Sequence, residues 1–217
     1  MAAEAERTSQ ILLDIGAVTL NLENPYTYVS AIRSPVYTDC RLLMGYPQER
    51  RTIAHLLAEK IAQTGNFDVI AGTATAGIPH AAWVSERLGK PMVYVRSEAK
   101  GHGKQNQIEG PTISDGQKVA VVEDLISTGS SSIATVEALR EAGATVDFIF
   151  AIMTYGMAKA DENFAKTRVR PIVLATFEDL VTKAAAIGQI NDSQREVILD
   201  WTKDTAGWWN RVQGQTT

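Results

Sequence analysis

The sequence of 217 residues contains a single cysteine, Cys40, which excludes an intrachain disulfide and a zinc site built from several thiolates. A lone cysteine is more often a small apolar residue of the core than a nucleophile. No apolar run reaches the roughly 18 residues that span a bilayer, and the charged N-terminal segment lacks the apolar core of a signal peptide. A net charge of −4 argues against a general binder of nucleic acid or membrane surfaces. We therefore expect a cytoplasmic protein.

Apolar and charged residues make up 45% and 21% of the chain, which are ordinary values for a globular domain. From about residue 47, short apolar segments alternate with amphipathic ones. The apolar segments predict five strands, at residues 67–72, 91–95, 118–122, 145–153 and 172–175. The amphipathic segments predict helices at residues 48–63, 76–88, 130–142 and 161–166. This alternation is typical of α/β folds with a mostly parallel sheet and right-handed crossovers.

The two ends of the chain depart from this alternation. We expect a helix at about 3–15, strand-and-turn material at 20–41, and two last helices at 180–187 and 193–212. The prediction is one domain over 1–217, divided into an N-terminal region of about 1–45, a core of about 46–180 and C-terminal helices at about 181–217. Ligands of such sheets bind beyond the carboxyl ends of the strands, which selects the loops at 73–77, 96–110, 123–131 and 154–158.

Two adjacent acids, Glu123 and Asp124, follow the third predicted strand in the stretch VAVVEDLISTGSSS. The hydroxyl-rich and glycine-containing loop after them opens a helix, and such a helix N-terminus binds phosphate. Carboxylates repel phosphate, but they accept hydrogen bonds from sugar hydroxyls or hold Mg²⁺. The combination indicates a site for a ribose 5-phosphate. The alternative, a helix cap, needs only one of these hydroxyl residues, and the sequence has no Walker A pattern.

The loop at residues 96–110, RSEAKGHGKQNQIEG, carries the main basic cluster of this acidic chain: Arg96, Lys100, His102 and Lys104. Polar loops of this length are usually functional lids or disordered segments. Its cations can close over a departing diphosphate and stabilise charge that develops only in the transition state. The alternative is a solvated hairpin tip.

The stretch VVEDLISTGSSS is similar to the phosphoribosyl pyrophosphate (PRPP) motif of type I phosphoribosyltransferases: apolar residues, two acids, two apolar residues, then Thr, Gly, a small residue and Ser or Thr. The pattern R-x-E-A-K-x-H-G upstream resembles the orotate phosphoribosyltransferases in particular. The resemblance implies a Rossmann-like type I phosphoribosyltransferase fold, with a small N-terminal hood over a PRPP-binding core. It also implies Mg²⁺-dependent transfer of ribose 5-phosphate from PRPP to orotate, giving orotidine 5′-monophosphate and pyrophosphate in pyrimidine biosynthesis.

The same resemblance assigns catalysis to Lys100, His102 and Asp124. It implies that PRPP binds to residues of both motifs: Arg96, Lys100, His102, Glu123, Asp124, Leu125, Ile126, Ser127, Thr128, Gly129, Ser130 and Ser131. The implied pyrophosphate loop consists of Thr73, Ala74, Thr75 and Ala76. The implied orotate residues are Ser127, Tyr37 and Arg41. Mg²⁺ is expected to be carried by PRPP near Glu123 and Asp124 without a fixed set of protein ligands, and the family implies a homodimer with active sites shared between subunits.

Three positions depart from the family pattern. Ser97 stands where the best-known bacterial members have lysine, Ala76 where the pyrophosphate loop often has lysine, and Tyr155 where many members have an arginine near orotate. Two alternatives remain open at this point. One is a phosphoribosyltransferase for another base, such as a purine. The other is a non-catalytic PRPP sensor that regulates transcription.

Overall fold

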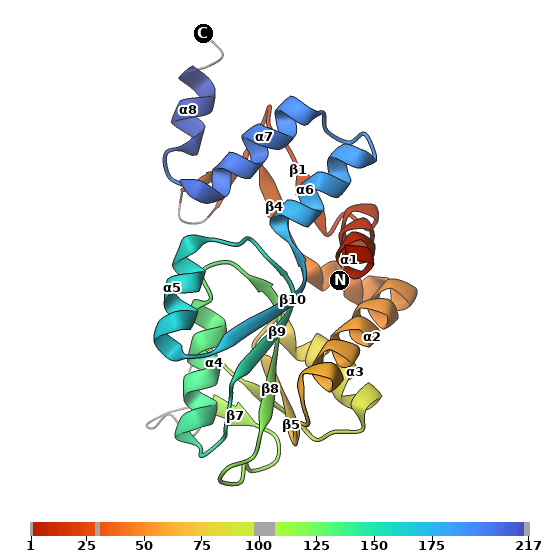
Figure 1. Ribbon diagram of the computed structural model, residues 1–217, viewed down its shortest axis with the longest axis vertical. Coiled ribbons are helices and arrows are strands. Elements are labelled where there is room, and N and C mark those ends of the chain that lie inside the picture. Colours follow the sequence, from red (N-terminus) through yellow and green to blue (C-terminus); the bar gives the residue numbers. More distant parts are fainter. Residues whose placement is uncertain (1, 29–30, 98–106, 215–217) are drawn as a thin grey trace.

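The computed structural model describes residues 2–28, 31–97 and 107–214. Within these ranges the chain forms a six-stranded sheet in the order β10-β9-β8-β5-β6-β7 (Figure 1). Its strands are β5 (Val69–Thr73), β6 (Met92–Val95), β7 (Ile108–Glu109), β8 (Val119–Ile126), β9 (Phe148–Thr154) and β10 (Arg170–Thr176). All neighbours pair in parallel except β7, which runs antiparallel to β6. The predicted α/β class with a mostly parallel sheet is confirmed, with one strand more than the five predicted.

Helices cover both faces of this sheet, which is why its strands are apolar almost throughout. One face carries α1 (Ala2–Asp14), α2 (Pro47–Thr64) and α3 (Gly77–Leu88), and the other carries α4 (Ser130–Glu141) and α5 (Ala158–Thr167). Ala120 and Val122 of β8 belong to the core on the first face. Val119 and Val121 belong to the core on the second face, together with Val136 of α4. The chain therefore has two apolar layers, one on each side of the sheet.

Strand β8 is longer than the sequence pattern indicates, because it continues through the acid pair to Ile126. Glu123 pairs with Ala151 of β9 in the same parallel register as the apolar residues before it. Backbone hydrogen bonds to β9 extend the strand whatever the polarity of its side chains. On the other side, pairing with β5 stops at Val122. At the acid pair, β8 is therefore paired with β9 but no longer with β5.

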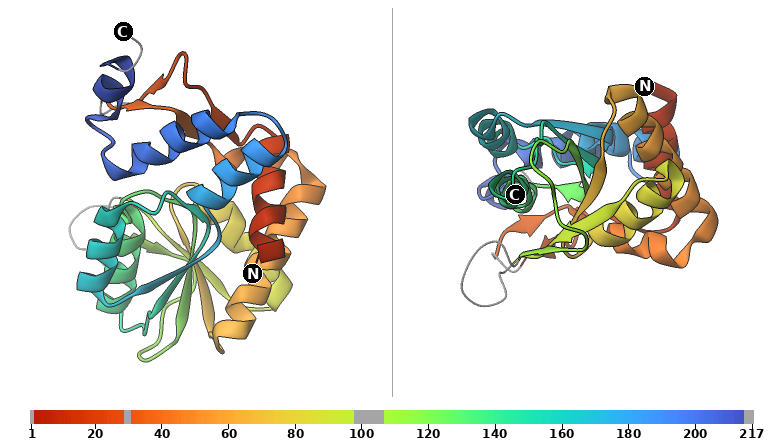
Figure 2. Two further views of the ribbon diagram at one scale, coloured as in Figure 1. Left: turned by 45° about the horizontal axis from the view of Figure 1, so that its top comes forward. Right: turned by 90° about the horizontal axis from the view of Figure 1, so that it is seen from below.

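The hood and the C-terminal helices lie together at one end of the molecule, beyond the sheet (Figures 1 and 2). The hood consists of β1 (Val18–Leu20) paired with β4 (Val36–Thr38), β2 (Tyr26–Thr27) paired with β3 (Arg33–Ser34), and the 3-10 helix η1 (Cys40–Gly45). The C-terminal segment consists of α6 (Phe177–Ala186), α7 (Asp192–Asp200), the 3-10 helix η3 (Trp201–Lys203) and α8 (Trp208–Gly214). Trp201 Nε1 donates to the carbonyl of Arg33 at 3.1 Å, and the Arg33 guanidinium lies 5.1 Å from the Trp209 ring centre. The C-terminal segment therefore holds the hood in place.

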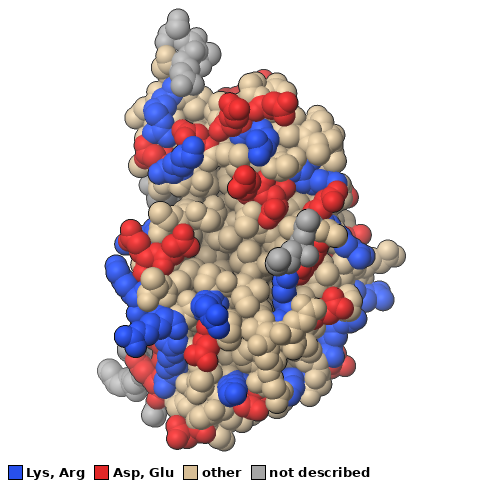
Figure 3. Space-filling view, viewed as in Figure 1, with Lys and Arg blue, Asp and Glu red and all other residues tan. Residues whose placement is uncertain are grey.

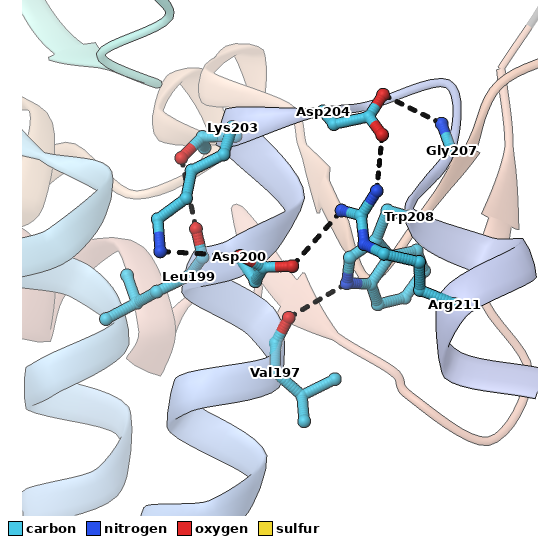
Figure 4. Close-up of polar contacts among 9 residues, drawn as sticks. Val197, Leu199, Asp200, Lys203, Asp204, Gly207, Trp208 and Arg211 are labelled. Carbon is cyan, nitrogen blue, oxygen red and sulfur yellow. Dashed lines mark hydrogen bonds and ion pairs between the residues drawn. The ribbon is translucent and has the colours of Figure 1, made fainter. Parts of the chain in front are cut away.

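The predicted helix over residues 193–212 is wrong, because the structure breaks it into α7, η3 and α8. Asp204 accepts a hydrogen bond from the backbone N–H of Gly207 at 2.9 Å and pairs with Arg211 (Figure 4). Such a local side-chain bond competes with helix hydrogen bonds and favours a turn. Trp208, which follows the turn, is 1% exposed. The tryptophans have the spacing of one continuous helix, but the hydrogen bond of Asp204 between them favours a turn in the backbone.

Acidic and basic side chains are interspersed over the face seen in Figure 3. Among the described residues, no helix combines the length and the apolar character needed to cross a bilayer.

Candidate active site

The order of the strands reverses beside β5, which marks where a ligand binds. The chain continues from β5 to β6 on one side, whereas β8, β9 and β10 extend the sheet on the other. In open α/β sheets the crevice at such a reversal, beyond the carboxyl ends of the strands, is the binding site. The two loops that flank it are those after β5 and after β8, and both were selected from the sequence.

The loop after β5 is built for close approach to β8. A Cβ added to Gly77 would lie 2.6 Å from the Val122 carbonyl oxygen and 3.5 Å from Glu123 Oε1. Only glycine therefore lets the start of α3 rest directly on β8 beside the acid pair. The peptide bond between Ala74 and Thr75 is cis. The N-terminus of α3 has no side-chain cap. The Ile78 N–H donates to the Thr75 carbonyl at 3.3 Å and Pro79 has no N–H, so the N–H groups of residues 76 and 77 are the ones that can face an anion.

Thr73 and Ala74 show how this loop is held. Ala74 donates its backbone N–H to the Val95 carbonyl at 2.9 Å, which places the loop beside the root of the basic loop. Thr73 is 3% exposed, and its Oγ1 makes no hydrogen bond to any described residue.

The loop after β8 also leaves a helix N-terminus open. Gly129 has φ +77, and a Cβ there would lie 2.6 Å from the Phe164 ring, so the position requires glycine. Asn163 Nδ2 of α5 donates to the Thr128 carbonyl at 3.0 Å and fixes the loop from behind. No side chain caps α4, although five hydroxyl residues surround its start, at positions 127, 128, 130, 131 and 132. Ser127 and Ser130 are exposed, as a ligand-binding loop requires.

The two acids have different surroundings. Glu123 is 4% exposed, and its Oε2 accepts hydrogen bonds from Ser131 Oγ at 3.1 Å and from Ser132 Oγ at 3.0 Å. Its Oε1 accepts from the backbone N–H of Asp124 at 3.1 Å. Burial, reinforced by the charge of Asp124, raises the pKa of Glu123 to about 8. Asp124 is only half-buried. The carboxyl of Glu123 is therefore occupied within the protein, whereas Asp124 is the more exposed acid of the pair.

The hood brings the predicted orotate residues to the same end of the sheet. Burial raises the pKa of Asp124, and hydrogen bonds with Glu123 and with the backbone, followed by the charge of Arg41, oppose this shift. The Arg41 side chain is 57% exposed and is held by Asp39, with Nε to Oδ1 at 2.7 Å and Nη2 to Oδ2 at 2.9 Å. Tyr37 is 44% exposed, and its ring centre lies 5.6 Å from that of Tyr26. Asp39 is absent from the predicted site residues, although its place two residues before Arg41 is a signal for the pair.

Comparisons with known proteins agree with this geometry. The chain matches the family described as phosphoribosyl transferase domain over residues 46–178. An orotate phosphoribosyltransferase of Listeria monocytogenes serotype 4b is 52% identical over 204 residues, which cover 94% of this chain and 97% of that protein. The chain belongs to the orotate phosphoribosyltransferase family.

Solved structures support the same family. The orotate phosphoribosyltransferase of Aeropyrum pernix is 34% identical, with a TM-score of 0.72, and the match covers 84% of this chain and 99% of that one. The UMP synthase of Leishmania donovani is 27% identical, with a TM-score of 0.77, over 91% of this chain. The chain spans only 42% of that longer protein.

The basic loop that distinguishes orotate phosphoribosyltransferases is described only at its two ends. Lys100 and His102 lie outside the described residues. Arg96 follows β6, where its backbone N–H donates to the Gln107 carbonyl at 2.9 Å. Its Nη1 lies 3.6 Å from Glu109 Oε1 on β7. The two-residue strand β7 closes the base of the loop, and it is too short to have left a pattern in the sequence.

Tyr155, which stands where many orotate phosphoribosyltransferases have arginine, points into the core. It is 5% exposed, and its ring centre lies 5.7 Å from that of Phe177 and 5.4 Å from that of Trp201, both edge-on. Burial raises the pKa of its phenol, so the side chain is neutral. The assignment of orotate to Ser127, Tyr37 and Arg41 remains a prediction.

Substituting Gly77 by alanine tests the close approach of α3 to β8. The added Cβ forces backbone away from backbone, so we expect a loss of about 2 kcal/mol in the free energy of unfolding. The same shift displaces the pyrophosphate loop and should lower kcat/KM about tenfold. Gly214→Ala is the control, because a Cβ there meets nothing within 4 Å. Urea unfolding and steady-state kinetics that do not distinguish the two variants would contradict this account.

Proposed function

We propose that this protein transfers ribose 5-phosphate from PRPP to orotate and releases orotidine 5′-monophosphate and pyrophosphate. The observation that carries the proposal is the pair of uncapped helix N-termini that follow β5 and β8, the strand that carries Asp124, in a chain of this family. Two anion sites suit the two ends of PRPP, which carries a 5′-phosphate and a pyrophosphate. A carboxylate between them suits the ribose hydroxyls. The reaction is a step in pyrimidine biosynthesis.

The 5′-phosphate is assigned to the loop after β8 and the start of α4. Backbone N–H groups there have no side-chain cap, and the exposed hydroxyls of Ser127 and Ser130 add donors. The hydroxyl of Ser131 already donates to Glu123, so Ser131 contributes its backbone N–H. Leu125 and Ile126 precede the loop in β8, where they position it. The pyrophosphate is assigned to residues 73–76, which open α3.

Phosphoribosyltransferases are generally Mg²⁺-dependent, and the acids here fit an ion that arrives with its substrate. The described residues contain no cluster of three or more His, Cys, Asp or Glu able to hold a metal. Mg²⁺ commonly uses one or two carboxylates, several waters and substrate phosphates. Asp124 offers one such carboxylate, and the oxygens of Glu123 are already hydrogen-bonded. When bound with PRPP, the ion would neutralise charge on the pyrophosphate.

The chain's own residues then account for the transfer. The bond between ribose C1 and the pyrophosphate oxygen breaks, and the electron pair leaves with pyrophosphate. Lys100, His102 and Arg96 supply positive charge to that leaving group, and the Asp124 carboxylate stabilises the positive charge that develops on the ribose. A nitrogen of the orotate anion attacks C1 from the other side. Closure of the loop at 96–110 excludes water that would otherwise attack the ribose.

We also propose that the protein is a homodimer with shared sites. Four exposed apolar side chains lie on β4, on η1 and at the start of α2: Tyr37, Leu42, Met44 and Tyr46. Exposed apolar side chains grouped in one short segment are typical of a contact with another protein. The family resemblance implies a second copy as the partner, with the loop at 96–110 reaching its active site. We retain as proposals one domain with the divisions at about 45 and 180, and a cytoplasmic location.

A screen of nucleobases tests the proposed function against its alternatives. Purified protein with PRPP and Mg²⁺ is offered orotate, uracil, adenine, hypoxanthine and xanthine separately, and each nucleotide product is quantified by chromatography. We expect orotidine 5′-monophosphate to form at least about 100-fold faster than any other product, because a site that pairs with a substrate's polar groups strongly rejects analogues without them. Preferred use of a purine would favour the first alternative. PRPP binding without any product would favour the sensor.

A further inference from the structure

Four aromatic rings join the hood to the sheet and to the C-terminal segment. Tyr28 comes from the hood, Tyr155 from the end of β9, Phe177 from the start of α6, and Trp201 from η3. The Tyr28 ring centre lies 6.2 Å from that of Trp201, and the Tyr155 ring centre lies 5.4 Å from it. All these contacts are edge-to-face, an arrangement that favours a fixed geometry. The cluster thus fixes the position of the hood relative to the core.

The hydroxyls of this cluster form a chain of hydrogen bonds that ends at the Val36 carbonyl; we call this chain the relay. Tyr28 Oη donates to the Val36 carbonyl at 2.8 Å. Tyr155 Oη lies 3.4 Å from Tyr28 Oη. Because the Tyr28 hydrogen is used on Val36, Tyr155 is the donor to Tyr28. Ser34 Oγ donates to the same Val36 carbonyl at 2.8 Å. The relay ends in β4, at the residue before Tyr37.

The backbone of Tyr155 is bound to the other side of the site. Its N–H donates to the Ile126 carbonyl at 3.0 Å, and Thr154 Oγ1 donates to the same oxygen at 3.2 Å. Ile126 directly precedes Ser127, the first residue of the phosphate loop. Tyr155 is therefore tied by its backbone to one wall of the site and by its hydroxyl to the other.

We propose that Tyr155 is a positioning residue for the nucleobase: its hydroxyl holds β4, and with it Tyr37, at the correct distance from Ser127. The inference rests on the proposed function and deepens it. Tyr155 is 5% exposed, so it acts through the residues on either side and not by touching the base. PRPP is held mainly by helix N-termini that belong to the core, outside the relay. Loss of the relay should therefore affect orotate and leave PRPP binding nearly unchanged.

Tyr155→Phe tests this inference, because it removes the hydroxyl and keeps the ring contacts. We expect KM for orotate to rise about fivefold, the effect of one net hydrogen bond. KM for PRPP and the melting temperature should stay close to the wild-type values. Tyr28→Phe should raise KM for orotate further, since Tyr28 also bonds Val36. The double variant should be no worse than Tyr28→Phe, because both residues act in one relay.

Thr64→Val is the control, since the Thr64 hydroxyl donates to the Lys60 carbonyl at 2.7 Å at the end of α2, outside the hood and the relay. It should leave KM for orotate unchanged. Equal KM values for orotate in Tyr155→Phe and wild-type protein would overturn the inference. Turnover of orotate by the wild-type protein would still support the proposed function. A parallel rise in the KM values of both substrates, with a lower melting temperature, would also overturn it. Wild-type protein inactive on orotate would overturn both.

Discussion

Replacing Asp124 by asparagine is expected to lower kcat/KM for PRPP by about two to three orders of magnitude, the usual effect of removing one charged group that stabilises a transition state. We propose that Asp124, the more exposed acid of the pair, faces the ribose. Asparagine keeps the shape but loses the negative charge that opposes the positive charge on the ribose. Steady-state kinetics with varied PRPP measures the loss, and unfolding in urea should show a stability close to that of the wild type.

Glu123→Gln is the matched control for this prediction. The Glu123 carboxyl is buried and hydrogen-bonded to Ser131, Ser132 and the backbone of Asp124. Its pKa is raised to about 8 by burial, so the neutral amide resembles the form favoured at neutral pH. We expect less than about a tenfold loss in kcat/KM, since only internal hydrogen bonds are changed. A larger loss for Glu123→Gln than for Asp124→Asn would contradict the division of roles.

Replacing Lys100 by alanine is expected to lower kcat at least about 100-fold, while KM for PRPP changes little. The physical reason is that its charge acts on pyrophosphate as that group leaves, and so counts mostly in the transition state. Lys90→Ala is the control, because Lys90 precedes β6 at the opposite end of the sheet and its Nζ contacts Asn66 Oδ1 at 3.3 Å. Single-turnover kinetics separates chemistry from product release. Normal kcat in Lys100→Ala would exclude the loop from catalysis.

Mixing the two inactive variants tests whether sites are shared between subunits. In a dimer of one Lys100→Ala and one Asp124→Asn subunit, one of the two sites has both wild-type residues if Lys100 acts across the interface. After co-refolding, random pairing should restore about 25% of wild-type activity. Sedimentation gives the oligomeric state in the same sample. No recovery in a mixed dimer would place Lys100 and Asp124 of one site on the same subunit.

The parallel sheet and its two layers of helices could be predicted because strands buried on both faces leave continuous apolar segments in the sequence. The site at the ends of β5 and β8 followed from the same rule together with the acid pair and the open hydroxyl loop. The roles of Lys100 and His102 rest on the basic loop in the sequence and on the family resemblance, since both residues lie outside the described ranges.

Other features depend on contacts that no local pattern records. The division between Glu123 and Asp124 arises because Ser131 and Ser132 return to the strand from α4. The extension of β8 to Ile126 depends on pairing with β9. The requirement for glycine at Gly77 depends on its distance to Val122, at the place where the strand order reverses. Each is a tertiary effect that overrides what the neighbouring residues indicate.

The most direct measurement follows orotate itself. Wild-type protein is mixed with orotate, PRPP and Mg²⁺, and the initial rates of orotate loss and of pyrophosphate release are recorded in one reaction, with Asp124→Asn run in parallel. The proposed function predicts equal rates, orotidine 5′-monophosphate as the nucleotide formed, and almost no reaction in the variant. Pyrophosphate release without loss of orotate, or no reaction in the wild type, would contradict it.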